Sequence, residues 1–383
     1  MSKKIVFAAI SGGVDSAVSA ALLQKVGYEV IGVFIKTWHP NFLQCNEEEE
    51  RRDAMRVAAH LDIPFLTFDF EDVYKKEVAD YMISEYKMGR TPNPDVMCNK
   101  KVKFGGFLKK ALSMGADYVA TGHYAQNFGC WTPGFRVSNT RNWQSYELKK
   151  GEDQSKDQSY FLWTLNQKQL SRILFPVGHL KKTEVRKMAI KFNLPVAEKK
   201  DSQGICFLGD INLKEFLKHY IKGKKGKVLN TSGEEIGYHN GVVFYTLGER
   251  HGFTITKKSP NDGPYYINDK NIKKNVLIVS QDKNLKNFPA FALGVKGQGT
   301  HSSLSFSNFD LVIKNTNWIS KAPDEKKIYT AQIRYHGEFL SCKIRIVRQD
   351  IATIIFNKSV LVASGQSCVI YDKNICLGGG VIV

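Results

Sequence analysis

Two cysteines, each in a loop of unusual composition, are the side chains of this sequence best suited to covalent chemistry. Cys98 lies in Arg90–Lys100 (RTPNPDVMCNK), where two prolines among Thr, Asn and Asp predict a rigid, non-helical loop. A thiol near the start of the helix that follows is expected to have a lowered pKa and to react as a thiolate. Cys206 lies in a second polar turn with a glycine, Asp201–Phe207 (DSQGICF). Because the two cysteines are far apart along the chain, only the fold can bring them together.

The other five cysteines have no comparable context, and we predict that they are small buried apolar residues. They are Cys45, Cys130, Cys342, Cys368 and Cys376. The total of seven is odd and no Cys-x-x-Cys pair occurs, which argues against a disulfide framework and a zinc knuckle. We therefore expect no metal bound by cysteine, and we expect any functional cysteine to act as a thiol.

Ser11–Ser16 (SGGVDS) is a candidate anion-binding loop between an apolar strand and a helix. In open α/β sheets such a loop lies at the carboxyl ends of the strands, where ligands bind. The glycines let the backbone approach an anion, and Ser11, Ser16 and the first helix amides supply donors. Asp15 would cap the helix or help to hold magnesium. An ordinary tight turn with a serine cap is the alternative. The motif is neither Gly-x-Gly-x-x-Gly nor Walker A, which argues against NAD binding and γ-phosphoryl transfer.

The elements that must position these residues alternate between strands and helices in the first half of the chain. Short apolar runs predict buried strands at Ile5–Ile10, Val30–Ile35, Phe65–Phe70 and Tyr118–Thr121. Helical patterns cover Ala17–Val26, a segment from Glu47 onward, and Asn99–Met114. This alternation predicts an α/β fold with a doubly wound parallel sheet.

The second half of the chain is β-rich. After a helix at Leu213–Ile221, short strands are predicted at Val242–Leu247 and Val276–Val279. Four further segments favour a small barrel or sandwich: Tyr329–Tyr335, Leu340–Val347, Thr353–Phe356 and Ser367–Tyr371. We therefore predict three domains, comprising residues 1–208, 209–282 and 283–383.

The composition favours a basic protein that binds a polyanion. The 383 residues carry 55 Lys plus Arg against 37 Asp plus Glu, a net charge of +18. Such an excess attracts nucleic acid, although a lysine-rich proteome would give the same balance. No apolar run is long enough to span a membrane, and the chain enters an apolar strand within its first residues, leaving no room for a signal peptide. We expect a cytoplasmic protein without membrane contact.

The strand–SGGVDS–helix pattern resembles the PP-loop of the ATP pyrophosphatases, which cleave ATP between its α- and β-phosphates. The ordered motifs that follow resemble the tRNA-specific 2-thiouridylases across essentially the whole chain. They are Thr91–Asp95 with Cys98–Lys100, Lys156–Leu162, Ser202–Phe207, and Ser364–Ser367 with Leu377–Gly380. The resemblance implies a Rossmann-like PP-loop domain, a small central domain and a C-terminal β-barrel. It also implies ATP and Mg²⁺ as cofactors.

The resemblance further implies an activity and a set of nucleotide contacts. The C2 oxygen of the wobble uridine (position 34) of tRNA would be adenylated and then replaced by sulfur. Cys206 would carry that sulfur as a persulfide, and Cys98 would release it through a transient Cys98–Cys206 disulfide. Asp95 would be a general acid or base, or else stabilise a turn. The residues implied for the nucleotide are Ala9, Ile10, Ser11, Gly12, Gly13, Val14, Asp15, Ser16, Ile35 and Gly122.

By the same resemblance, three segments would contact tRNA. Asn93, Pro94 and Asp95 would lie beside the target base, which must leave its stack to react. Lys156, Asp157, Gln158, Arg334 and Tyr335 would contact the anticodon region. Arg334 and Tyr335 are otherwise an exposed strand pair of no special role, and the basic run Lys222–Lys227 is a solvated loop or an RNA contact. Partners would be tRNAs for Lys, Glu and Gln and a sulfur-relay protein or cysteine desulfurase.

Two features depart from the family pattern. Glu249 stands where relatives usually have Gln, and residues 127–145 are longer than usual. Two other functions remain open: a PP-loop ligase of small molecules, which needs no paired cysteines, and a non-catalytic RNA-binding protein of the same fold.

Overall fold

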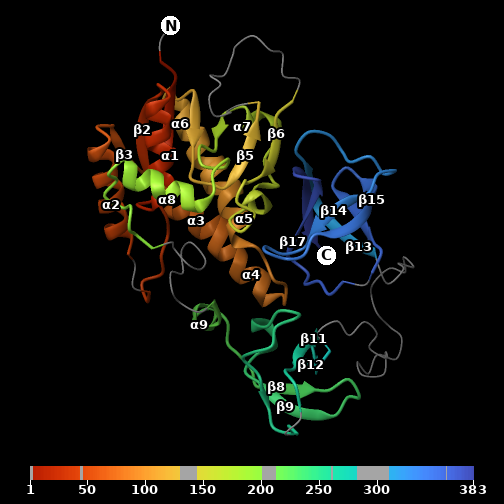
Figure 1. Cartoon of the computed structure of the whole chain (residues 1–383). Coiled ribbons are helices and arrows are strands. Elements are labelled where there is room, and N and C mark those ends of the chain that lie inside the picture. Colours follow the sequence, from red (N-terminus) through yellow and green to blue (C-terminus); the bar gives the residue numbers. More distant parts are fainter. Residues whose placement is uncertain are drawn as a thin grey trace.

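The computed structural model describes residues 3–43, 46–129, 145–200, 213–259, 262–282, 310–358 and 360–383. They form an N-terminal α/β unit, a small central β unit and a C-terminal barrel, which Figure 1 shows in red to yellow-green, green to cyan, and blue. The predicted fold class is confirmed.

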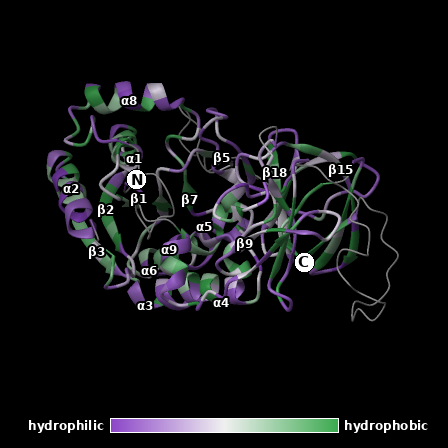
Figure 2. Cartoon of the chain, turned by 90° about the horizontal axis from the view of Figure 1, so that it is seen from below, coloured by the Kyte–Doolittle hydropathy of each residue, from purple (hydrophilic) through white to green (hydrophobic). Residues whose placement is uncertain are grey.

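A five-stranded parallel sheet forms the centre of the N-terminal unit. Its order is β3 (Phe65–Asp69), β2 (Glu29–Lys36), β1 (Ile5–Ala9), β4 (Tyr118–Ala120) and β7 (Ile173–Leu174). The inner strands are apolar because helices cover both faces. Figure 2 shows the outer helix α2 largely hydrophilic (purple) beside more hydrophobic (green) strands. All four strands expected in this half of the chain are confirmed.

The helices divide between the two faces of this sheet. One face carries α1 (Val14–Lys25), α2 (Glu47–His60) and α8 (Lys182–Lys191). The other carries α3 (Glu71–Tyr74), η1 (Lys75–Asp80), α4 (Tyr81–Lys87), α5 (Pro94–Met97), η2 (Cys98–Phe107) and α6 (Leu108–Ser113). The helix predicted from Asn99 is present, but η2 is a π-helix that begins at Cys98. Such π segments are rare and concentrate at functional sites.

The central unit is a five-stranded sheet that follows the short helix α9 (Leu213–Lys218). Its order is β10 (Thr254–Ile255), β9 (Glu235–His239), β8 (Gly226–Leu229), β12 (Val276–Ser280) and β11 (Tyr266–Asn271). The strand predicted at Val242–Leu247 was wrong, because Val242–Phe244 forms a 3₁₀ turn, η4. Gly241 enters this turn with φ of 132°, and Val242 and Phe244 are both buried. A single turn buries these side chains as well as a strand would, so apolar composition alone could not separate the two.

The C-terminal unit is a closed six-stranded barrel. Its order is β13 (Asp310–Trp318), β16 (Ile351–Phe356), β15 (Leu340–Arg348), β14 (Tyr329–Gln332), β17 (Ser367–Asp372) and β18 (Ile375–Ile382). A β13–β18 pairing closes it. The barrel alternative is therefore confirmed over the sandwich. However, β14 ends at Gln332, so Arg334 and Tyr335 lie in a turn rather than in the predicted strand, and backbone reversal at His336 (φ 56°) explains the early end.

The barrel is joined to the N-terminal unit through hydrogen-bonded strands. β18 also pairs with β6 (Glu147–Lys150), which forms a hairpin with β5 (Ala125–Phe128). The short elements η3 (Ser159–Leu162) and α7 (Gln167–Leu170) follow this hairpin. Figure 1 shows β5 and β6 between the parallel sheet and the barrel. No helix in the described part of the chain is both long and apolar enough to cross a membrane.

Candidate active site

The Ser11–Ser16 loop is a closed turn at the carboxyl end of β1. The Ser16 hydroxyl donates to the Gly13 carbonyl at 3.0 Å and accepts from the Ser11 amide at 3.2 Å. Gly12 has a φ of 74°, and a Cβ there would lie 2.4 Å from the Glu50 carbonyl oxygen of α2. Gly13 precedes α1 without a side-chain cap. Neither a serine cap nor an Asp15 cap is therefore present, and both of those alternatives were wrong.

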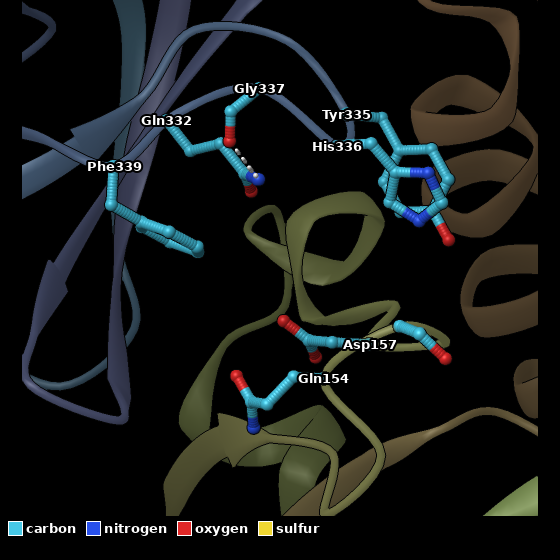
Figure 3. A pocket seen from close by; sticks show the side chains of 8 residues that line it. Gln154, Asp157, Gln332, Tyr335, His336, Gly337 and Phe339 are labelled. Atoms are coloured by element: carbon cyan, nitrogen blue, oxygen red, sulfur yellow. Dashed lines mark hydrogen bonds between the residues drawn. The ribbon is translucent and has the colours of Figure 1, made fainter.

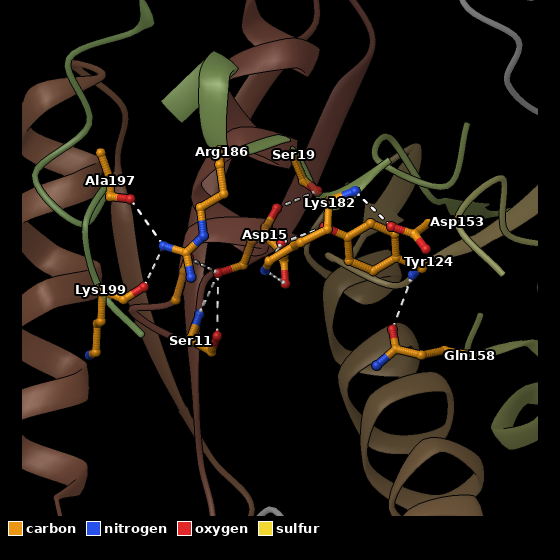
Figure 4. A network of polar contacts seen from close by, with 12 residues as sticks. Ser11, Asp15, Ser19, Tyr124, Asp153, Gln158, Lys182, Arg186, Ala197 and Lys199 are labelled. Carbon is orange, nitrogen blue, oxygen red and sulfur yellow. Dashed lines mark hydrogen bonds and ion pairs between the residues drawn. The ribbon is translucent and has the colours of Figure 1, made fainter. Parts of the chain in front are cut away.

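Asp15 is instead held by a lysine and a tyrosine from distant segments (Figure 4). The Lys182 ammonium, at the start of α8, lies 2.7 and 2.8 Å from the two Asp15 carboxylate oxygens. The Tyr124 hydroxyl donates to the same carboxylate at 2.7 Å. The Lys182 side chain is largely buried. A cation is therefore held beside a loop suited to an anion, so a phosphate could take the place of the carboxylate as its partner.

Sequence reasoning missed Lys182. Its only signal is a lysine at the start of a helical pattern, in a segment with five more lysines from position 181 to position 200. The backbone amide of Lys182 donates to Asp153 at 2.9 Å, which fixes the start of α8 at the loop.

The other residues predicted for the nucleotide lie along the same edge of the sheet. Ala9 ends β1 and Ile10 follows it, and the Ile10 amide donates to the Val33 carbonyl of β2 at 2.8 Å. Ile35 lies near the end of β2 and is half-buried. Gly122 follows β4 so closely that a Cβ there would lie 2.8 Å from the Ser16 amide nitrogen. The structure thus brings these positions together around the loop.

Asp15 is the carboxylate available for magnesium. In the described residues no cluster of three or more His, Cys, Asp or Glu could hold a metal ion. Mg²⁺ needs no such cage, because it binds through one or two carboxylates together with phosphate oxygens. The donor set at this loop fits that mode, provided that Lys182 leaves the carboxylate.

The loop before Cys98 is fixed by its own side chains. The Asn93 side-chain oxygen accepts from the Val96 amide at 3.1 Å and caps α5, with Pro94 as the first helical residue. Cys98 follows directly and is buried, with 3% of its surface exposed. A cysteine that reacts as a thiolate must be reachable, so the burial of Cys98 runs against the expectation of a reactive thiol. This burial arises because Cys98 packs in the apolar cluster that contains Val96 and Val102.

Asp95 lies one turn before Cys98 and is partly enclosed. Burial raises the pKa of the Asp95 carboxyl, and the charge of Lys103 offsets part of that effect. The Asn99 side chain donates to the Asp95 carbonyl at 3.0 Å. The side-chain oxygen of Asn99 is buried and has no hydrogen-bond partner in the described residues. This polar cluster lies next to the buried thiol.

Cys206 lies outside the described residues, as do Cys45 and Cys130. Arg186 anchors the chain just before the segment that carries Cys206, by donating to the carbonyls of Ala197 and Lys199 (Figure 4). The Lys199 ammonium in turn pairs with Asp53 of α2 at 2.7 Å. As predicted, Cys342, Cys368 and Cys376 are buried.

The segment Lys156–Gln158 connects the nucleotide side to the barrel. The Gln158 side chain accepts from the Tyr124 amide at 3.0 Å. Asp157 is buried and accepts from the Gly151 and Ser159 amides at 2.9 and 3.1 Å. Burial raises the pKa of the Asp157 carboxyl. Two of the three residues predicted to contact tRNA therefore also hold their own loop, and Lys156 is half-buried beside them.

A hollow of about 330 Å³ brings Asp157 together with Tyr335 (Figure 3). Its lining residues are Gln154, Ser155, Asp157, Gln332, Tyr335, His336, Gly337 and Phe339. The Tyr335 ring packs against Phe161, with 4.4 Å between the ring centroids. It stacks on the exposed His336, with 4.0 Å between the ring centroids. Arg334 is exposed on the same turn. Aromatic faces beside amide and carboxylate groups suit an unstacked base. Sequence reasoning missed His336.

Three family descriptions match consecutive parts of the chain. They are a tRNA methyl transferase HUP domain (residues 4–210), a tRNA methyl transferase PRC-barrel domain (214–281) and an aminomethyltransferase β-barrel domain (309–382). Curated proteins named tRNA-specific 2-thiouridylase MnmA are similar over nearly the whole chain. The protein from Bacillus cytotoxicus is 40% identical, over 97% of this chain and 93% of its own length. That from Nitrosomonas eutropha is 41% identical, over 100% and 99%.

Proposed function

The chain belongs to the tRNA-specific 2-thiouridylase family, and on that basis we propose that it replaces the C2 oxygen of the tRNA wobble uridine with sulfur at the expense of ATP. The observation that carries this proposal beyond similarity is the Ser11–Ser16 loop with Lys182 held at Asp15. A glycine-rich turn, a helix start and a buried cation supply what a pyrophosphate needs. The family descriptions mention methyl transfer, but an anion loop together with the two cysteine motifs is suited to adenylation and sulfur transfer.

The first step would be adenylation of the uridine. The C2 oxygen attacks the α-phosphate of ATP, and pyrophosphate leaves toward the Ser11–Ser16 loop and Lys182. Ile35 and Gly122 would border the adenosine. Magnesium, bound with the nucleotide at Asp15, would neutralise phosphate charge. AMP on the C2 oxygen turns a poor leaving group into a good one.

The second step would be sulfur transfer through the two cysteines. Cys206 would carry a persulfide, delivered by a sulfur-relay protein or a cysteine desulfurase. The Cys98 thiolate attacks the Cys206 Sγ, forms the Cys98–Cys206 disulfide and expels hydrosulfide. Hydrosulfide attacks C2 and AMP departs. A thiol reductant then restores both cysteines. Because Cys98 is buried, this step requires the side chains around its thiol to move apart when tRNA binds and the segment with Cys206 approaches.

Asp95 would move a proton at the reacting base. A carboxyl whose pKa burial has raised can accept or donate a proton closer to neutral pH than an ordinary aspartate. Asn93 and Pro94 would hold the flipped uridine beside it. The half-buried position of Asp95 in a capped, proline-bounded turn supports this role.

The tRNA would lie across the N-terminal unit and the barrel. Asp157 and Tyr335 line one hollow, and Arg334 lies on the same turn as Tyr335, which supports a shared contact with the anticodon region. Lys156 and Gln158 would contribute from the same loop. The acceptors would be the tRNAs for Lys, Glu and Gln, and the protein would act in the cytoplasm.

One reaction mixture separates this function from its two alternatives. Protein, ATP, magnesium, unmodified tRNA and a persulfide donor should yield thiolated tRNA with AMP and pyrophosphate. AMP formation without RNA would indicate a small-molecule ligase, and retarded RNA without turnover would indicate a binding protein. Cys206→Ser should abolish thiolation while tRNA binding persists. A fully active Cys206→Ser variant would remove the persulfide role.

A further inference from the structure

The short loop between α4 and α5, which leads to Asp95 and Cys98, is in contact with all three units of the molecule. At its start Arg90 pairs with Glu85 of α4. Thr91 is next, and it is buried. Its backbone amide donates to the Ser364 carbonyl of the barrel unit at 2.8 Å. Its hydroxyl lies 3.1 Å from the hydroxyl of Thr246 in the central unit. One residue therefore meets two other units.

The turn of the barrel unit that contacts Thr91 fits closely against it. Gly365 has a φ of 93°, and a Cβ there would lie 3.0 Å from both the Arg90 Cβ and the Thr91 carbonyl oxygen. Only glycine permits this approach without displacement. The Gly365 amide donates to the Ile382 carbonyl at 2.9 Å, which ties the turn to β18. The Ser364–Ser367 motif thus forms a turn that fits against Thr91.

The turn of the central unit that contacts Thr91 is held by its own hydrogen bonds. The Thr246 amide donates to the Glu249 carboxylate at 3.1 Å, and the Glu249 amide returns a bond to the Thr246 carbonyl at 3.2 Å. Lys214 pairs with the same carboxylate. The Gly248 amide donates to the Ile267 carbonyl of β11 at 2.7 Å. This closed turn presents the Thr246 hydroxyl to Thr91.

Thr91 is linked to the reactive groups by a stiff segment. Pro92 and Pro94 fix their φ angles, and the Asn93 cap fixes the start of α5. A displacement of Thr91 is therefore passed on to Asp95 and Cys98 rather than absorbed between them. In Figure 1 the lower end of α4 lies near both the barrel and the central unit, as these bonds require.

We propose that the contacts of Thr91 with the barrel and central units fix its position. Thr91 is then a positioning residue, which determines where Asp95 and Cys98 lie during thiolation. This role rests on the proposed function. It gives the two β-rich units a part in catalysis besides holding tRNA. Small misplacement of reacting groups lowers the rate of the chemical step with little effect on substrate binding.

The test measures kcat for thiolation, the KM for ATP and the dissociation constant for tRNA in Thr91→Val and Thr246→Val. We expect kcat to fall about tenfold in each, with both binding parameters unchanged. Either variant loses the bond between the two hydroxyls, and Thr246→Val also loses a hydrogen bond to Tyr86, so the double variant should be no slower than Thr246→Val. Thr91→Ser keeps the hydroxyl and should restore kcat.

Thr164→Val is the matched control, because the Thr164 hydroxyl is buried without a partner in the described residues. It should keep wild-type kcat. A wild-type kcat in Thr91→Val would overturn the positioning role. So would a loss of kcat in the double variant that equals the product of the losses in the two single variants. If Thr91→Val folds poorly, Thr246→Val decides alone, since it changes a different unit. Failure of the wild-type protein to thiolate tRNA would instead refute the proposed function.

Discussion

Lys182 and Asp15 are 167 residues apart in sequence, yet the lysine ammonium lies 2.7 and 2.8 Å from the two carboxylate oxygens. The pair joins the start of α8 to the loop after β1. A largely buried ammonium must be paired to offset its desolvation. In the proposed reaction, the phosphates of ATP would offer Lys182 a second anionic partner and would leave Asp15 available to magnesium.

Lys182→Met should therefore weaken use of ATP. We expect kcat/KM for ATP to fall about 100-fold, as when one oriented donor to a developing charge is removed. Binding of tRNA in a filter or gel assay should stay unchanged. Lys187→Met, at an exposed position of the same helix, is the control and should match the wild type. Unchanged ATP kinetics in Lys182→Met would show that this lysine serves only to neutralise Asp15.

Asp95→Asn should stabilise the protein at neutral pH while abolishing thiolation. Burial raises the Asp95 pKa, so the folded protein holds this proton at pH values where the unfolded chain has lost it. The free energy of unfolding therefore falls as the pH rises from the ordinary aspartate pKa to the raised pKa of Asp95. Asn removes this penalty. The Tm at pH 7.5 should exceed that of the wild type, and the difference should shrink toward pH 4.

Asp153→Asn provides a control of opposite sign. Hydrogen bonds from the Lys182 amide and the Ser155 hydroxyl lower the Asp153 pKa. That carboxylate stabilises the fold above the ordinary aspartate pKa, so its replacement should lower the Tm at pH 7.5 and lose its effect in acid. A lower Tm for Asp95→Asn at pH 7.5 would contradict the effect of burial on the Asp95 pKa.

Cys98→Ser should trap sulfur on Cys206. With the attacking thiol removed, the persulfide forms but is not released, so intact-protein mass spectrometry after donor treatment should find one added sulfur atom. Pyrophosphate release with tRNA should continue, because adenylation needs neither cysteine. Cys342→Ala is the control: burial raises the Cys342 pKa to about 12, so its thiol is inert and thiolation should persist. Thiolated tRNA from Cys98→Ser would exclude the disulfide step.

The parts of the fold that were predictable from sequence are those set by local pattern. Ile5–Ile10 and Val30–Ile35 are continuous apolar runs, and Ser11–Ser16 lies between a strand and a helix, so both the sheet and its loop could be predicted. Among the barrel strands, β15 alternates apolar and polar residues from Leu340 to Arg345. Each of these signals lies within a few neighbouring residues.

The parts that were missed depend on long-range contact. Lys182 does not differ in sequence from the other lysines near it, and only packing of α8 on α1 brings it to Asp15. The burial of Cys98 follows from the packing of the π-helical segment, which no local preference predicts. Tyr335 leaves its strand because the chain reverses at His336. Tertiary contacts decided each of these positions.

Glu249→Gln should lower stability slightly and leave catalysis intact. Burial lowers the Lys270 pKa to about 8, and the Glu249 charge opposes that shift. Because the unfolded chain binds this proton more tightly, stability rises with pH between about 8 and the ordinary lysine value. Without the Glu249 charge, burial of the charged Lys270 costs more, and the ion pair with Lys214 is lost. Because the site is partly exposed, we expect the free energy of unfolding to fall by at most about 1 kcal/mol.

The Tm of Glu249→Gln should accordingly lie below wild type at pH 7, and the gap should narrow toward pH 10. Its kcat should not change, since Gln can still accept from the Thr246 amide. Glu235→Gln, which breaks the exposed pair with Lys227, is the control and should show no pH-dependent gap. A gap that stays constant from pH 7 to 10 would mean that Glu249 does not act on Lys270.

Tyr335→Ala should weaken tRNA recognition without touching ATP use. The ring is half-buried against Phe161 and stacks on the exposed His336, so it offers a rigid edge of the hollow to an unstacked base. Loss of one stacking platform should raise the KM for tRNA about tenfold. Tyr335→Phe keeps the ring and should stay near wild type. Val347→Ala, at an exposed position of β15, is the matched control. An equal KM in Tyr335→Ala and Val347→Ala, with both proteins folded by Tm, would move the anticodon contact away from this hollow.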